Sequence, residues 1–138
     1  MDRVTSPRND DECIEQAIVS KGLNAPLVKR ADVANEIASE HYFTAAQGAV
    51  AAALEDLRAN EGRGHPEVFG LPVPKPLSLL TFCVIVLKNG VTVTGESACA
   101  SPENFDADIG RRVARANAVQ KIWPLLCFRL KDALNKQG

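Results

Sequence analysis

Residues 79–97 read LLTFCVIVLKNGVTVTGES, and this stretch decides the fold class. Asn89-Gly90 is a strong signal for a two-residue hairpin turn, because both central residues of a type I′ turn need a positive φ angle. The sequence therefore predicts an antiparallel hairpin with strands over 79–87 and 91–97. In that register one face carries Phe82, Val84, Val86, Val91 and Val93, and the other carries Cys83, Ile85 and Leu87 beside Thr92, Thr94 and Glu96.

The first of these strands is apolar on both faces, whereas two strands alone are only marginally stable in water. We therefore expect another strand, a helix or a second subunit to cover or extend the sheet. The same reasoning predicts a homo-oligomer, with a dimer favoured, because pairing of one surface patch with itself is the commonest closed arrangement.

Helices are expected after the hairpin. Ser101-Pro102 is typical of a helix N-cap followed by proline at the first helical position, and Asp106 offers a start one turn later. The expected buried stripe of this helix packs against the Phe82 face of the hairpin and consists of Phe105, Ile109, Val113, Ala116 and Trp123. Pro124 should break or kink the helix, and a last amphipathic helix is expected over 125–135.

The first half of the chain is expected to be helical over 10–59, after a flexible segment at 1–9. Apolar spacing predicts helices near 10–21, 30–40 and 45–59, the first of them ended by Gly22. Thr44, followed three residues later by Gln47, forms a capping-box pattern at the start of the third. The apolar stripe of that helix packs either inside the chain or against another copy, and it consists of Val50, Ala53, Leu54 and Leu57.

These elements together predict an α+β fold with one domain over 10–138. A Gly- and Pro-rich loop at 60–77 separates the helix-rich first half from the central antiparallel hairpin and the C-terminal helices at 78–136, which pack on the sheet.

Composition narrows the class of protein. The 138 residues carry a net charge of −1 and are 46% hydrophobic, which excludes a disordered chain and gives no global attraction to nucleic acid. No stretch is long and apolar enough to span a membrane, and the acidic N-terminus is unlike a signal peptide, so we expect a cytoplasmic protein. The four cysteines lack the close pairs of zinc sites, so we expect buried reduced thiols, no metal and no cofactor.

No nucleophile elbow, phosphate loop or metal-binding His motif occurs, so we expect no enzyme and no catalytic residues. The candidate ligand site combines small polar side chains with basic side chains on the following helix: Ser97, Ser101, Asn104, Arg111, Arg112 and Arg115. Hydroxyls, guanidinium groups and the N–H groups of a helix start suit a phosphate or nucleotide. The alternative is a capped helix with a solvated basic face, which is favoured by the acidic Glu103, Asp106 and Asp108.

Several motifs match a known family. They are Leu80-Thr81-Phe82-Cys83-Val84, Lys88-Asn89-Gly90, Gly95-Glu96-Ser97-Ala98-Cys99, Ser101-Pro102-Glu103-Asn104-Phe105-Asp106, Ile109-Gly110, Ala114 and Ile122-Trp123. With them, residues 10–135 closely resemble the small tailed-phage protein family named for gene 49 of phage N4 and gene 66 of phage Sf6. The chain differs at Cys127-Phe128, where the commoner family pattern has Gly-Tyr.

The resemblance implies a phage accessory protein in the host cytoplasm that acts by binding. By analogy with other small phage proteins, it would serve host takeover or counter-defence, by blocking a host protein or sequestering a small anionic, nucleotide-like ligand. The alternative is a nucleic-acid-binding regulator that uses the basic helix at 111–121.

Overall fold

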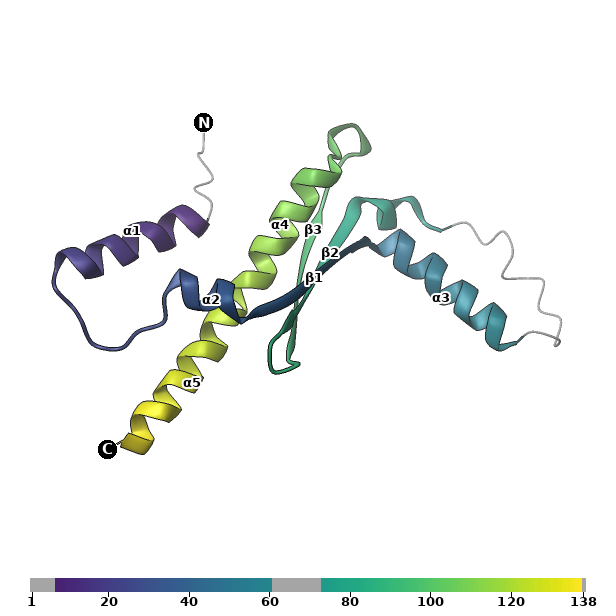
Figure 1. Cartoon of the computed structure of the whole chain (residues 1–138). Coiled ribbons are helices and arrows are strands. Elements are labelled where there is room, and N and C mark those ends of the chain that lie inside the picture. The colour runs from purple at the N-terminus through teal and green to yellow at the C-terminus, as the bar shows by residue number, and fades with distance from the viewer. Residues whose placement is uncertain (1–6, 61–72, 138) are drawn as a thin grey trace.

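The computed structural model describes the backbone of residues 7–60 and 73–137, and side chains from residue 14 onward within those ranges. The elements along the chain are α1 (Pro7–Ser20), α2 (Arg30–Glu36), β1 (Ile37–Thr44), α3 (Ala45–Ala59), the 3-10 helix η2 (Lys75–Leu79), β2 (Leu80–Leu87), β3 (Thr92–Ala98), the 3-10 helix η3 (Pro102–Asn104), α4 (Ala107–Gln120) and α5 (Ile122–Gln137). The predicted α+β class is confirmed: α4 lies on a three-stranded sheet, while α1 and α3 extend to either side (Figure 1).

The first helix begins earlier than expected. Pro7 lies at its start, so the segment predicted to be flexible at 1–9 is helical over its last three residues, and residues 1–6 lie outside the described part. Proline suits a helix start because its missing N–H has no partner there in any case. Gly22, with φ of 67°, ends the helix as predicted, and the Leu23 N–H donates back to the Ile18 carbonyl at 3.2 Å.

The prediction of an all-helical first half is wrong, because residues 37–44 form strand β1. β1 pairs antiparallel with β2, with Tyr42 opposite Cys83 and Phe43 opposite Phe82. The expected helix over 30–40 therefore stops at Glu36. Tertiary pairing outweighs helical spacing here, since the doubly apolar β2 would otherwise have an unpaired edge. The sheet order is β1-β2-β3.

The hairpin turn is confirmed at Asn89 and Gly90, but the predicted register is wrong by one residue. The Leu87 N–H donates to the Val91 carbonyl at 2.8 Å, so the loop has three residues and ends in Gly90 with φ of 91°. Such loops combine a type I turn with a left-handed residue. Val93 consequently lies opposite Ile85 instead of Val86, and a one-residue shift exchanges the faces of a strand.

The helix packs on the other face of β2 from the one predicted. Thr81, Cys83, Ile85 and Leu87 are buried, whereas Phe82, Val84 and Val86 are only half-buried. The expected stripe on α4 is also wrong: Ile109 and Val113 are 60% and 44% exposed. The buried face of α4 consists of Gly110, Ala114 and Ala118.

Gly95 on β3 explains why this small-residue face is the one that docks. A Cβ atom at Gly95 would overlap the backbone carbonyl of Ala114 and the backbone amide of Ala118. The backbone of α4 therefore lies directly on β3, and larger side chains on that helix face would hold the two backbones apart.

The core lies between the sheet and α4, and α2 and α5 close one end of it. Its buried members are Val33, Cys83, Ile85, Leu87, Val93, Ala114, Ala118, Ile122 and Leu126. Trp123 is half-buried at the edge of this core. The prediction that it packs against the Phe82 face is wrong, because Phe82 lies on the opposite face of the sheet. Glu36 and Arg129 fix α5 to the end of α2 by a double contact, with N–O distances of 2.9 and 3.1 Å.

The two C-terminal helices meet at a break at Lys121, which precedes Pro124 by three residues. Proline lacks the N–H that would bond to Gln120, so the break before it is confirmed. The last helix begins at Ile122, three residues before its predicted start. No helix among the described residues is long and apolar enough to cross a membrane.

Helix α3 has its predicted start but not the expected packing. The capping box is confirmed, because Thr44 and Gln47 exchange side-chain to backbone hydrogen bonds of 2.9 and 3.1 Å. No residue of the helix is buried, and Val50 and Leu54 of its apolar stripe are 46% and 54% exposed. Most of the predicted 60–77 loop lies outside the described residues.

Candidate functional site

The predicted ligand-site residues lie at three places. Ser97 lies on β3 opposite Thr81, on the face that α4 covers. Ser101 and Asn104 belong to the turn that holds η3, and the three arginines lie on α4. Within the described ranges, no hydrogen bond or ion pair joins the small polar side chains to the arginines.

The polar residues around Ser101 form hydrogen bonds with near neighbours in the chain. The Ser101 hydroxyl donates to the Glu103 carboxylate, and this hydrogen bond lowers the pKa of Glu103. The Asn104 N–H donates to the Ser101 carbonyl at 3.1 Å. The Asp106 carboxylate accepts the Ile109 N–H at 3.0 Å, so the N-terminus of α4 already holds an anion of its own.

The three arginines differ in their surroundings. Arg112 is exposed and forms an ion pair with Asp108 one turn earlier, at 3.1 Å. Arg115 contacts Glu40 of β1, and the side chains of this pair are 34% and 30% exposed. Arg111 is exposed, and no ion pair to it occurs in the described part of the chain. Because it precedes Arg115 by four residues, it lies on the same side of α4, one turn away.

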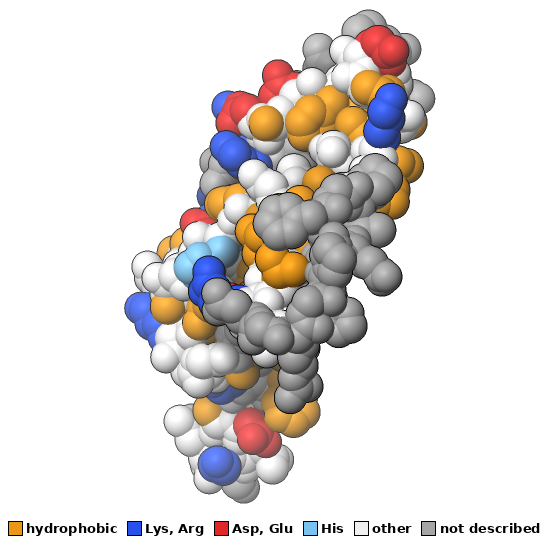
Figure 2. Space-filling view, turned by 90° about the vertical axis from the view of Figure 1, so that its right-hand side faces the viewer, with side chains coloured by type: hydrophobic (Ala, Val, Ile, Leu, Met, Phe, Trp, Pro, Cys, Tyr) orange, Lys and Arg blue, Asp and Glu red, His pale blue; other side chains and the backbone are white. Residues whose placement is uncertain are grey.

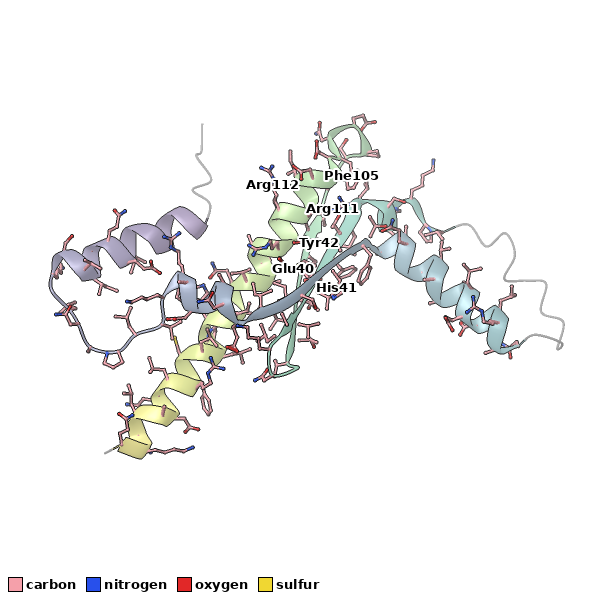
Figure 3. All side chains as sticks on the ribbon, viewed as in Figure 1. Glu40, His41, Tyr42, Phe105, Arg111 and Arg112 are labelled. Atoms are coloured by element: carbon pink, nitrogen blue, oxygen red, sulfur yellow. The ribbon has the colours of Figure 1, made fainter. Side chains whose placement is uncertain are left out.

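Glu40 and Tyr42 lie on β1 beside α4 (Figure 3), and they form a second polar group next to Arg115. The Tyr42 hydroxyl donates to Glu40 Oε1 at 3.1 Å, and Arg115 Nε donates to the same oxygen. We call Glu40, Tyr42, Arg111 and Arg115 the β1–α4 flank. The sequence reasoning missed its first two members because it placed residue 40 at the end of a helix.

Burial affects the pKa of two groups here, the Tyr42 hydroxyl of the flank and the Cys83 thiol next to it. It raises the pKa of Tyr42, and the neighbouring Cys83 and Glu40 raise it further. Burial also raises the pKa of the Cys83 thiol, which has no exposed surface. Both groups are therefore neutral at physiological pH, and the flank carries two guanidinium groups against one carboxylate.

The cysteines follow the sequence prediction only in part. Cys83 is buried and Cys99 is half-buried, but Cys127 is exposed on α5, so the expectation of buried thiols is wrong there. The side chain of Cys13 is outside the described part. No three metal-ligating side chains gather anywhere in the ranges that the structure describes.

The fold and this flank define a small α+β protein with a basic edge between its first strand and the helix on its sheet. Residues 28–134 match the Phage protein (N4 Gp49/phage Sf6 gene 66) family, and the chain belongs to this family, as its motifs predicted. No curated protein and no solved structure shows detectable similarity to the chain.

Proposed function

We propose that this phage protein acts by binding rather than by catalysis, in host takeover or counter-defence, by sequestering a small anionic, nucleotide-like ligand. The observation that supports this most is the pair Arg111 and Arg115, one turn apart on the β1–α4 flank, with Arg111 exposed and without an ion pair among the described residues. Guanidinium groups bind phosphates through two parallel hydrogen bonds, and two of them in sequence suit a ligand with several phosphate oxygens.

Glu40 restricts the side chain of Arg115. Its carboxylate holds the Arg115 guanidinium and accepts the Tyr42 hydroxyl, so Arg115 loses less side-chain entropy when it meets a phosphate. The ring of Tyr42 is half-buried at the same edge of the sheet. The small polar residues around Ser101 are less suited, because Glu103 already accepts the Ser101 hydroxyl and Asp106 accepts the Ile109 N–H at the start of α4.

Blocking of a host protein is a second mode of the same role. Five large apolar side chains on α4 and α5 are exposed and suit a protein partner: Ile109, Val113, Leu125, Phe128 and Leu134. Nucleic-acid binding is less favoured, because a net charge of −1 gives the chain no global attraction to a polyanion.

Recovery of the tagged protein from infected and uninfected host cells tests the proposal. A sequestering protein retains a stoichiometric anionic ligand and releases it chemically unchanged on denaturation, which mass spectrometry of the supernatant detects. Turnover of the recovered ligand would instead show an enzyme.

Two single variants locate the ligand. Arg111→Ala should weaken binding by about 10- to 150-fold, because a hydrogen bond to a charged group is worth about 1.5–3 kcal/mol. Arg112→Ala is the matched control, since it removes the same charge from the neighbouring position, where Asp108 already neutralises it. Equal loss in both variants, with a steep dependence on salt, would point to nucleic acid instead. A retained host protein with no small molecule would favour the blocking mode.

A further inference from the structure

The sheet has one covered and one open face. The open face, which is turned away from α4, carries Leu80, Phe82, Val84 and Val86 of β2 and Phe43 and His41 of β1. The Phe43 and Phe82 rings lie with their centroids 5.7 Å apart, and Phe43 is 38% exposed. On the side to which α3 extends, hydrophobic side chains reach the surface in several separate groups (Figure 2). On β3 this face carries the exposed polar Thr92, Thr94 and Glu96, so its apolar part lies over β2 and the end of β1. Such an apolar surface on a small sheet is stabilised by a second layer.

Helix α3 has an apolar stripe that is largely exposed. It is 15 residues long, it has no buried residue, and its stripe presents Val50 and Leu54 between small alanines. A helix of this length is marginal in water unless its apolar side packs against something. Within residues 7–60 and 73–137, therefore, one sheet face lacks a covering helix, and α3 exposes two large apolar side chains.

Local geometry keeps the two apart within one copy. α3 begins at Ala45, directly after the last residue of β1, and the capping box at Thr44 fixes the angle of entry. The helix contacts η2 and the strands only near its start and then leads away from the sheet (Figure 1). Without a connecting loop it has no means of folding back over its own open face.

We infer that α3 of one copy packs on the open sheet face of a second copy, and that the second copy returns the same contact. This reciprocal exchange is a closed twofold arrangement in which one patch pairs with itself. It gives the sheet its missing layer, and the alanines of α3 allow a close approach to β2.

The area involved is close to the lower limit for a dimer interface. A helix of 15 residues covers roughly 220 Å² of a flat surface, from a rise of 1.5 Å per residue and a width of about 10 Å. Two such contacts, each removing surface from a helix and from a sheet, bury about 900 Å² before the relief of the side chains is counted. Biological interfaces begin near 1,000 Å².

Light scattering during size-exclusion chromatography tests the oligomeric state. The protein should have twice its chain mass of 14.8 kDa at tens of micromolar. Leu54→Glu should raise the dissociation constant at least about tenfold, because it places an unpaired charge in an apolar contact. Phe128→Glu is the matched control, since it adds the same charge at an exposed apolar side chain on α5. A monomer at high micromolar concentration, or a dimer dispersed by Phe128→Glu and unchanged by Leu54→Glu, would overturn the inference.

Disulfide trapping tests the specific contact. Leu54→Cys and Val84→Cys are made in separate chains in which Cys13, Cys99 and Cys127 are replaced by Ser, and the two proteins are mixed and oxidised. A covalent dimer should form in the mixture and not in either protein alone. Absence of the cross-link in a mixture that is dimeric by light scattering would show that the copies associate through another surface.

Discussion

Gly95→Ala should be among the most destabilising single substitutions in this chain. Its Cβ would overlap backbone atoms of Ala114 and Ala118 and would lie 2.9 Å from the Asn117 carbonyl carbon, whereas real Cβ contacts below 3.0 Å essentially do not occur. Backbone atoms of a packed helix do not rotate away as a side chain does. Helix α4 must therefore lift from β3 by about 1 Å, which loosens the contact of Ala114 and Ala118 with the sheet.

The expected loss is about 3 kcal/mol, at the upper end of the range for overpacked cores. In a protein of this size it corresponds to a melting temperature lower by about 10 °C. Urea and thermal denaturation followed by circular dichroism measure it, with all variants at one protein concentration so that association does not enter the comparison.

Gly48→Ala is the control because it is the same substitution with the opposite expectation. A Cβ at Gly48 meets only the Phe43 ring, at an ordinary 3.6 Å, and alanine in a helix interior gains about 0.5–1 kcal/mol over glycine. If Gly95→Ala proves as harmless as Gly48→Ala, the close docking of α4 on β3 is refuted.

Two further predictions concern charge and reactivity. The hydrogen bond from Arg129 lowers the pKa of Glu36 below 4.5, so the pair stabilises the fold fully above that pH and loses its effect as the pH falls through the lower folded value. The destabilisation by Arg129→Ala should therefore be present at pH 7 and vanish in acid. A constant difference in unfolding free energy between the two proteins from pH 7 to pH 2 would contradict this. Iodoacetamide should modify Cys127 in the native protein and Cys83 only after unfolding, because Cys83 is buried and its pKa is raised, and mass spectrometry of the modified peptides would show any early reaction at Cys83.

Local signals in the sequence were reliable wherever a few neighbouring residues decide the backbone. Asn89-Gly90 marks the hairpin turn, Gly22 ends the first helix, and Thr44 with Gln47 starts α3, because each depends on a φ angle or a capping hydrogen bond within one turn of chain. The motifs around the hairpin also indicated the family. The sequence could even show that β2 needed more than one strand beside it.

The candidate site was predictable only in its arginines. Arg111 and Arg115 lie on α4 as expected, but their neighbours Glu40 and Tyr42 come from a strand that was taken for a helix. Helical spacing of Val33 and Ile37 gives the same pattern whether the chain continues as a helix or turns into an edge strand. Residues 75 positions apart, such as Glu40 and Arg115, meet only after that choice is made.

The sequence by itself determined the turn, the end of α1, the start of α3, the apolar nature of β2 and the membership of the family. Only the tertiary structure decided that residues 37–44 form a strand, that Val93 pairs with Ile85, and that α4 docks through Ala114 and Ala118 instead of Ile109 and Val113. The physical reason is steric. Register and docking face depend on how closely two backbones approach at Gly95, and that distance is set by contacts between segments far apart in the chain.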